Sequence, residues 1–343
     1  MMEKILLRSK FRGSLLGALV GDCCGAPFEG QLMDSGTKIV LRNNLNKLEG
    51  PFFKAPFKKY TDDTAMTKCV ANTLLDPNGF SQKLLAKNFV LEYFKDPRRG
   101  YGAAVGDVFA KLRKSKIADP VGPAAEQFGG SGSYGNGAAM RIAPIALYCA
   151  NRDKSEMIKL VQESSLVTHS NTLAIHGAVL QALAIRQSLL CDPKEKFDGM
   201  SFLQQLKADI VELEKSNDPD LDAHHNAYEI QLSRLQNLME GKMEPSDENV
   251  LNMLGHSVEA LHSVPTALFC FLKHTSQEGG EKPFRATLEY AISLGGDTDT
   301  IASMACAISG AYYGAEVISE NLIKHCEDAE TIVQLADKLS SVA

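Results

Sequence analysis

Near its start the chain reads Gly13-Ser14-Leu15-Leu16-Gly17-Ala18-Leu19-Val20, and near its end it reads Ala302-Ser303-Met304-Ala305-Cys306-Ala307. Both stretches are apolar, and both carry small residues on several faces of the helix that they would form. Helix axes approach one another more closely where the side chains between them are small. We therefore expect both stretches to be central helices of the core.

Most other segments repeat apolar residues at three- and four-residue spacing, which is typical of amphipathic helices. The pattern is clearest at residues 84–94 and 331–339. The same pattern predicts helices over residues 11–20, 63–75, 106–113, 138–150, 155–165, 173–190, 201–215, 227–239, 247–257, 266–274, 284–294 and 300–313. No run of β-branched residues alternates with period two between turns, so no sheet is required. The sequence predicts an all-α fold.

Two stretches lack a clear helical period. Residues 30–60 mix Gly, Pro, Asn and Lys, and residues 276–283 resemble a solvated loop. Neither is long enough to separate domains, and no fixed-period repeat is visible. We expect a single compact domain over residues 1–343.

Composition limits the classes of protein to consider. The chain has 343 residues, of which 44% are hydrophobic and 23% charged, and its net charge is −6. These values are typical of a folded soluble protein, and a net negative charge disfavours direct binding of duplex nucleic acid. The uncharged stretch at residues 300–315 is too short to span a membrane, and residues 1–13 lack the apolar core of a secretory signal. The 8 scattered cysteines are expected to be reduced core thiols.

Four separate segments combine glycines with oxygen-bearing side chains at predicted helix ends. They are residues 21–29, 61–64, 132–137 and 295–300. For any one segment, capping of a helix is the simpler interpretation, because Ser, Thr and Asp accept bonds from the first helical N–H groups. Together they favour a site.

Two of these segments hold more acid than one cap can use. Thr61-Asp62-Asp63-Thr64 and Asp297-Thr298-Asp299-Thr300 each place two carboxylates and two hydroxyls within four positions. If their helices pack side by side, four carboxylates share one pocket and repel one another unless a cation neutralises them. Oxygen ligands select hard ions such as Mg²⁺, Mn²⁺ or Ca²⁺, and the doubled acids favour two ions over one.

The motifs and their order resemble those of the ADP-ribosylglycohydrolases. They are GDxxGxxxE (Gly21, Asp22, Gly25, Glu29), TDDT at 61–64, GSYGNGAAMR at 132–141 and LGGDTDT at 294–300. Finer features are similar to the branch that hydrolyses serine-linked ADP-ribose, poly(ADP-ribose) and O-acetyl-ADP-ribose, namely Glu29, Gln127-Phe128, His169 and Ser263-Val264-Pro265-Thr266-Ala267. The resemblance covers residues 11–340 and implies a single orthogonal helical bundle with a dinuclear metal site at helix N-termini.

The resemblance also implies the metal ligands and the catalytic groups. The ligands of two Mg²⁺ ions, for which Mn²⁺ is a substitute, would be Thr61, Asp62, Asp63, Asp297, Asp299 and Thr300, with Asp299 as the bridge. Glu29 would lie on a mobile flap of residues 26–60, close on one metal and assist proton transfer. Glu29, Asp297 and Asp299 are the expected catalytic residues.

Substrate contacts follow from the same resemblance. The loop that holds the diphosphate would be Ser131, Gly132, Ser133, Tyr134, Gly135, Asn136 and Gly137. The remaining contacts would come from Asp62, Phe128, His169 and Val258. Two departures stand out: Ser131 occupies a position where relatives often have Lys, and Gly255-His256-Ser257-Val258 replaces an expected Gly-Asn-Gly-Ile.

The resulting hypothesis is a Mg²⁺-dependent hydrolase of the C1″ O-glycosidic bond of ADP-ribose, acting in the reversal of DNA-damage ADP-ribosylation. Its partners would be ADP-ribose, serine-linked ADP-ribosylated proteins, poly(ADP-ribose) and O-acetyl-ADP-ribose. The alternatives are an arginine-specific ADP-ribosylhydrolase and a non-catalytic ADP-ribose-binding module. We expect a monomer in the nucleus and cytoplasm, with the mitochondrial matrix as a further compartment.

Overall fold

The described part of the chain folds into α-helices and short 3₁₀ turns, with no β-strand among its residues. The computed structural model describes residues 2–51, 58–215, 226–242, 245–275 and 282–343. The longer helices are α1 (Met2–Gly25), α2 (Ser35–Glu49), α3 (Asp62–Leu74), α4 (Gln82–Lys95), α5 (Ala103–Lys114), α8 (Lys154–Ser165), α9 (Thr172–Leu190), α10 (Gly199–Lys215), α11 (Ala227–Met239), α12 (Asp247–Leu254), α13 (Ala260–Thr275), α14 (Pro283–Ser293), α15 (Thr298–Tyr313) and α17 (Ala329–Val342). The short ones are α6 (Gly122–Ala125), α7 (Ala143–Tyr148) and α16 (Glu320–Lys324). The all-α prediction is confirmed.

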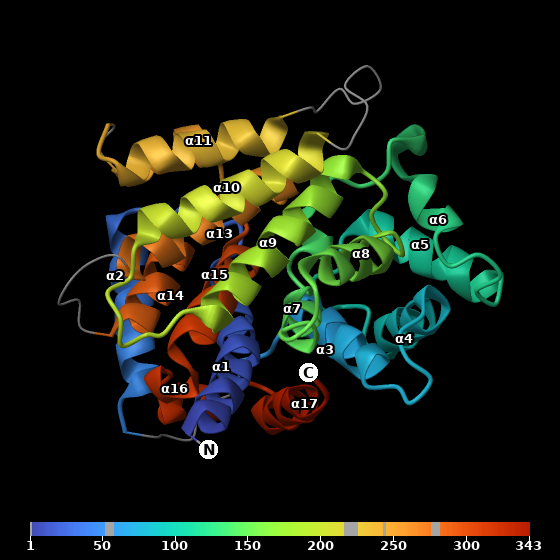
Figure 1. Cartoon of the computed structure of the whole chain (residues 1–343), viewed down its shortest axis with the longest axis horizontal. Helices are drawn as coiled ribbons and strands as arrows, with labels where there is room; N and C mark the ends of the chain where they lie inside the picture. The colour runs from blue at the N-terminus through green and yellow to red at the C-terminus, as the bar shows by residue number, and fades with distance from the viewer. Residues whose placement is uncertain (1, 52–57, 216–225, 243–244, 276–281) are drawn as a thin grey trace.

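The centre of the bundle is an antiparallel pair formed by α1 and α15 (Figure 1). One face of α1 presents a glycine at every fourth position, and at each of them the backbone of α15 occupies the space of a side chain. A Cβ added there would lie 2.3 Å from the carbonyl oxygen of Gly310 at Gly13, 2.2 Å from that of Cys306 at Gly17, 2.3 Å from that of Ala302 at Gly21 and 2.5 Å from Cα of Asp299 at Gly25. The small-residue stretches therefore form the predicted central helices.

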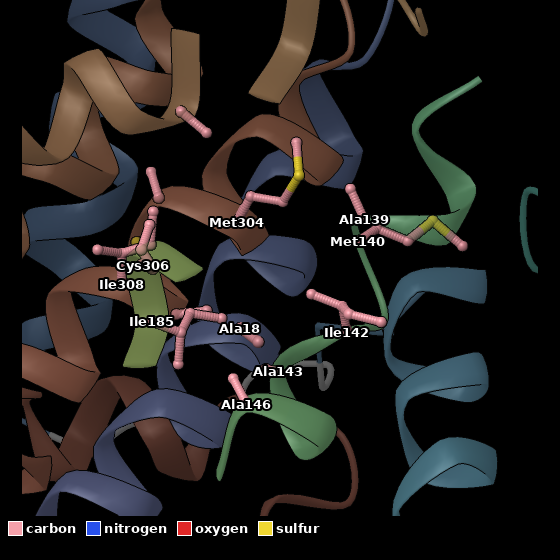
Figure 2. Close-up of a cluster of buried hydrophobic side chains, with 14 of the residues drawn as sticks. Ala18, Ala139, Met140, Ile142, Ala143, Ala146, Ile185, Met304, Cys306 and Ile308 are labelled. Carbon is pink, nitrogen blue, oxygen red and sulfur yellow. The ribbon is translucent and has the colours of Figure 1, made fainter. Parts of the chain in front are cut away.

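Other helices pack around this pair and complete one continuous core. Figure 2 shows side chains of α1, α7, α9 and α15 meeting in it, among them Ala18, Ala143, Ala146, Ile185, Met304, Cys306 and Ile308. All of these side chains are buried. The order of contacts brings the C-terminal end of α1 to the N-terminal end of α15, which is where the acidic motifs lie.

Helix α9 has the composition of a membrane-spanning helix but is enclosed by other helices of the bundle. Its residues Thr172–Leu190 are long and apolar enough to cross a membrane by length and composition, but 72% of that apolar window is buried inside the bundle. Its neighbours include α8, α13 and α15. The apolar length of α9 is that of a helix enclosed by others.

Residues 30–60 show no clear helical period in the sequence, but residues 35–49 among them form α2. Asp34 begins the helix by accepting the N–H of Thr37 at 2.7 Å, and Leu41, Leu45 and Leu48 are buried at four- and three-residue spacing. Lysine and asparagine on the exposed faces obscured this period in the sequence. Residues 52–57 of the expected flap and 276–281 of the expected loop lie outside the described residues.

Helix limits differ elsewhere for local reasons. The helix expected at 138–150 is a 3₁₀ turn at Asn136–Ala138 followed by α7, because Pro144 fits only the first turn of a helix. The helix expected to reach residue 257 ends at Leu254, where Gly255 adopts φ +85°. That early end frees residues 255–259 to run beside the site.

Candidate functional site

Asp22 is a structural residue that holds the start of α3. Its buried carboxylate accepts the N–H of Thr61 at 2.9 Å, the N–H of Thr64 at 3.1 Å and the hydroxyl of Thr64 at 2.6 Å. Burial raises the pKa of Asp22 to about 6, although these donors oppose the shift. Because its oxygens are used in this way, Asp22 joins α1 to α3 and positions the acidic turn.

Asp63 brings the two acidic motifs together. Its Oδ2 accepts the hydroxyls of Thr61 and Thr300, each at 3.3 Å, so α3 and α15 begin side by side as the sequence analysis required. Its other oxygen, Oδ1, is buried without a hydrogen-bond partner in the described part of the chain. A buried carboxylate oxygen that lacks a donor is unfavourable unless something else compensates it.

Three further carboxylates form a compact group beside Asp63. One ligand oxygen from each of Glu29, Asp297 and Asp299 lies within 4.8 Å of the others, a spacing that could hold a metal ion. The side-chain amide of Asn136 orients Asp297 by donating to Oδ2 at 2.5 Å, and it donates to Ser263 at 3.0 Å. The main-chain N–H of Asp297 donates to the carbonyl of His256 at 3.0 Å.

The backbone before α15 requires glycine. Gly295 and Gly296 adopt φ +76° and +70°, and a Cβ on Gly296 would lie 2.1 Å from the carbonyl oxygen of His256. This left-handed turn aims the first turn of α15 at the site. The Gly-Gly pair of the LGGDTDT motif is therefore a steric requirement for the position of Asp297 and Asp299.

The electrostatics of the group are unfavourable without a cation. Burial and the neighbouring acids raise the pKa of Asp62 to about 8 and that of Asp299 to about 9, and they raise the pKa of Asp63 well above its usual value. None of these side chains takes part in an ion pair with another described residue. The donor set, all carboxylate and hydroxyl oxygen, fits hard divalent cations.

A cavity of about 550 Å³ opens from the acidic group. The predicted site residues that line it are Glu29, Asp62, Asp63, Phe128, Ser133, Tyr134, Gly135, Asn136, Gly137, His169, Val258, Asp297, Asp299 and Thr300. Thr61, Ser131 and Gly132 do not line it. Thr61 contacts Asp63 from behind, while a Cβ on Gly132 would lie 2.1 Å from the Ser170 hydroxyl.

The glycine-rich loop is held against the segment that follows Gly255. The N–H of Asn136 donates to the carbonyl of Val258 at 2.9 Å, and the N–H of Ala260 donates to that of Tyr134 at 3.1 Å. Val258 itself is 60% exposed at the cavity wall. The loop is thus tied to the chain that also contacts Asp297 through His256.

An exposed aromatic pair lies at the cavity wall. The rings of Phe128 and Tyr134 have centroids 6.0 Å apart and planes inclined by 38°, and the residues are 57% and 42% exposed. Phe128 adopts φ 52°, which is uncommon for a bulky residue and marks a position where the fold holds the backbone in an unfavourable region. Two exposed rings of this kind suit a planar heteroaromatic ligand.

Glu29 follows a short turn at Ala26–Phe28, and only a few bonds fix it. The N–H of Gly30, which adopts φ +69°, donates to the carbonyl of Gly296 at 3.2 Å. Partial burial and the neighbouring Asp297 raise the pKa of Glu29. Within the predicted flap, α2 is packed through its buried face, and residues 29–34, between the turn at Ala26–Phe28 and α2, form no helix.

Sequence reasoning missed several residues at the cavity. Met66, Gly100, Gly102, Ala103, Ala104, Val105, Met140 and Arg141 line it without having been assigned a role. Arg141 carried a signal, since it is a single charge followed by an apolar run. The segment from Gly100 to Val105 carried none, because its small residues resemble those of any loop that leads into a helix.

A second missed feature supports the Thr61-Asp62 turn. Arg99 donates to the carbonyl of Tyr60 at 2.9 Å and to both carboxylate oxygens of Glu327, at 3.0 and 3.1 Å. Its guanidinium carbon lies 3.9 Å from the centre of the Tyr60 ring, and its own carbonyl accepts the N–H of Asp62 at 2.7 Å. The chain entering α3 is therefore fixed from a segment near the C-terminus.

Comparisons with known proteins agree with this geometry. Residues 3–343 match the model of the family described as ADP-ribosylglycohydrolase. The chain is 40% identical to "ADP-ribosylhydrolase ARH3" of Mus musculus over 97% of this chain and 92% of that protein, and 39% identical to the protein of the same name of Homo sapiens over 97% and 93%. A solved "ADP-ribosylglycohydrolase-related protein complex" superposes with a TM-score of 0.62 at 21% identity, covering 100% of this chain and 99% of that one, which supports the fold.

The family match over nearly the whole chain, the relatives at 39% and 40% identity and the cavity lined by the four motifs lead to one conclusion. The chain belongs to the ADP-ribosylglycohydrolase family and is an ADP-ribosylhydrolase.

Proposed function

We propose that this ADP-ribosylhydrolase is Mg²⁺-dependent and cleaves the C1″ O-glycosidic bond of ADP-ribose attached to serine, to another ADP-ribose, or to acetate. The observation that carries the proposal is the cavity, which is lined by an acidic group, a glycine-rich loop and an aromatic pair. These parts suit the distal ribose, the diphosphate and the adenine of one ligand. The proposal rests also on the resemblance of Glu29 and residues 127–137 to the serine-specific branch.

Two Mg²⁺ ions are part of the proposal. Asp297 and Asp299 would hold one, with Glu29 as a further ligand only while no substrate is bound, and Thr61, Asp62, Asp63 and Thr300 would complete the other, with Asp299 shared. The fit rests on the unpartnered Oδ1 of Asp63 and on the raised pKa of Asp62 and Asp299, since both features indicate missing positive charge. When bound, such ions orient neighbouring hydroxyls and lower the pKa of water.

The side chains have separate tasks in the reaction. Asn136 holds Asp297 in one orientation, and Asp22 holds the turn that carries Asp62 and Asp63. Glu29 has a raised pKa and lies between the turn at Ala26–Phe28 and α2, so, once free of the metal, it suits a general acid that donates its proton to the leaving oxygen as the C1″–O bond breaks. Water adds at C1″ and gives up a proton that restores the Glu29 acid, so the products are ADP-ribose and free serine, a shortened polymer or acetic acid.

The deciding experiment is release of ADP-ribose from a serine-ADP-ribosylated peptide, measured with Mg²⁺, with Mn²⁺ and with EDTA. Asp299→Asn should reduce release by orders of magnitude. Asp198→Asn is the control and should retain release, because Asp198 caps the start of α10 and does not line the cavity. Release that persists in EDTA would contradict the metal dependence.

The alternatives predict different products from the same assay. An arginine-specific enzyme would release ADP-ribose from an arginine-linked peptide and leave the serine-linked one intact. A non-catalytic binding module would bind ADP-ribose in Mg²⁺ and release nothing from either peptide. Poly(ADP-ribose) and O-acetyl-ADP-ribose in parallel reactions would rank the acceptors.

The proposal extends to the setting of the enzyme. Substrates of this class would place it in the nucleus and cytoplasm and in the mitochondrial matrix, acting as a monomer that reverses ADP-ribosylation after DNA damage. Fractionation of cells that express a tagged chain, together with light scattering of the purified protein, tests both parts.

A further inference from the structure

Arg141 is a fully buried cation at the cavity wall, and it pairs with no carboxylate of the described residues. Its donors are instead divided between two parts of the site. Nη1 donates to the carbonyl of Gly137 at 2.8 Å, while Nη2 donates to the hydroxyl of Thr168 at 2.8 Å and the carbonyl of Ser164 at 3.3 Å. Its guanidinium carbon lies 4.8 Å from the centre of the Phe89 ring, which limits its movement.

The hydroxyl of Thr168 links Arg141 to His169, and its bond to Arg141 determines which way it donates. A guanidinium can only donate, so the Thr168 oxygen accepts from Arg141 and retains one proton to donate. The one acceptor that the described structure offers to that proton is Nδ1 of His169, at 2.7 Å. Nδ1 is then an acceptor, and the ring carries its own hydrogen on Nε2.

Nε2 of His169 faces the glycine-rich loop. A Cβ on Gly137 would lie 3.2 Å from it and one on Gly135 would lie 3.7 Å from it, while the residue lines the cavity. The hydrogen bond at Nδ1 is the ring's one bond to described residues, which leaves the Nε2 hydrogen for a ligand. The glycines keep this space open.

We propose that Arg141 and Thr168 are positioning residues that fix His169 as a neutral imidazole donating from Nε2 to an oxygen of the diphosphate–ribose half of the ligand. In this role His169 binds and orients ADP-ribose and does not transfer protons. The proposal rests on the proposed function for the identity of the ligand. It also gives the buried charge of Arg141 a role, because Arg141 donates to the carbonyl of Gly137 in the glycine-rich loop. That loop has Ser131 where relatives often have a lysine.

Electrostatics support the neutral state. Burial lowers the pKa of His169 to about 3, and the charge of Arg141 acts in the same direction. Burial also lowers the pKa of Arg141 to about 9, so the guanidinium remains charged at neutral pH. An imidazole beside a buried cation therefore has a stable neutral form through the working pH range.

The test is a long-range ¹⁵N–¹H spectrum of the magnesium-loaded protein labelled at histidine, at neutral pH. The chain has 8 histidines, and the His169 signals are assigned by their loss in His169→Gln. The expected pattern is a neutral ring with hydrogen on Nε2. Thr168→Val, which keeps the shape and removes the hydroxyl, should abolish the single tautomer, and Thr168→Ser should retain it.

Binding of ADP-ribose by calorimetry is the second readout. Thr168→Val should weaken it about tenfold, the size expected when one hydrogen bond to a charged group is lost, and Thr168→Ser should stay within about twofold. His169→Gln, whose amide nitrogen replaces Nε2, should bind more tightly than His169→Asn, whose amide replaces Nδ1. This second pair keeps the test valid if a Thr168 variant fails to fold.

Hydrogen on Nδ1, a charged ring, or equal binding by His169→Gln and His169→Asn would overturn the proposal. The tautomer is measured without turnover, so its result stands apart from the proposed function. A wild-type protein with hydrogen on Nε2 that releases nothing from the serine-linked peptide would overturn the proposed substrate and leave the positioning intact.

Discussion

Gly310 of α15 lies against the backbone of Gly13 in α1, so closely that a Cβ on Gly310 would stand 1.9 Å from the Gly13 carbonyl oxygen. The contact is backbone to backbone, and no side-chain rearrangement can relieve it. The two central helices are therefore held at a separation that only glycine allows.

Gly310→Ala should lower the free energy of unfolding by about 3 kcal/mol, because the helices must separate to admit one methyl group. Urea denaturation measures the change. Gly36→Ala is the matched control, since Gly36 lies in the exposed first turn of α2 and its added Cβ would come no closer than 3.4 Å to another atom. That variant should be neutral or slightly stabilising, and an equal loss in both variants would contradict the packing argument.

In EDTA the protein should lose stability as the pH rises from about 5 to 9. The pKa values of Asp62 and Asp299 are raised to about 8 and 9 in the folded state, so the folded protein binds protons that the unfolded chain releases near pH 4. The stability from these groups is complete below pH 4 and is lost as the pH passes the folded-state pKa values. Thermal melting with and without Mg²⁺ tests this, and the rise in Tm on adding Mg²⁺ should be larger at pH 9 than at pH 6.

Asp299→Asn should reduce both the loss of stability with rising pH in EDTA and the rise in Tm on adding Mg²⁺, because it removes one of the interacting carboxylates and a predicted ligand. A Tm in EDTA that is equal at pH 6 and pH 9 in the wild-type protein would show that the acids are compensated by a group within the chain.

Phe128→Leu should weaken binding of ADP-ribose about tenfold, since stacking of a base on an aromatic ring contributes about 1–3 kcal/mol. The exposed pair of Phe128 and Tyr134 has no other described aromatic partner that would compensate. Phe128→Tyr keeps the ring and should bind normally. Calorimetry with ADP-ribose and with ribose 5-phosphate separates the effect, because the second ligand has no adenine and should bind both variants equally.

Glu327→Gln should raise the Mg²⁺ concentration needed for half-maximal activity by about threefold to tenfold. The change removes the charge that orients Arg99, and Arg99 holds both Tyr60 and the N–H of Asp62. Glu330→Gln, in the first turn of α17, is the control for a nearby loss of charge. If the maximal rate falls while the Mg²⁺ requirement stays constant, the Arg99–Glu327 pair does not act through the turn that carries Asp62.

Small-residue spacing was sufficient to predict the central helices, and the acid-rich motifs were sufficient to predict that their carboxylates lie together, while the rest of the cavity wall was expected from the family resemblance. Both signals are local in sequence and both have a steric or electrostatic reason. The contact between Glu327 and Arg99 could not be predicted in this way, because the two residues are 228 positions apart and neither lies in a segment with a recognisable pattern.

Helix α2 was missed for a related reason. Its buried face is only Leu41, Leu45 and Leu48, the exposed apolar pair Ile39 and Val40 falls outside that period, and the other positions are mostly polar. Its ion pairs, such as Arg42 with Glu289 at 2.8 Å, join segments that no local pattern connects. The role of Asp22 was likewise hidden, because an acid in a glycine-rich motif resembles a ligand until its three donors are seen.

The row of glycines on α1 that packs against α15, which is Gly13, Gly17, Gly21 and Gly25, also limits how the sequence can change over evolutionary time. Its last contact, Gly25 against Asp299, ends beside the cavity, so a substitution anywhere along this row would displace a carboxylate that the proposed reaction uses. Drift on this face is coupled to activity, whereas the outward faces of α10 and α11 carry no such burden (Figure 1). Substitutions are therefore expected to be tolerated more readily on that outer edge, where they leave the position of Asp299 unchanged.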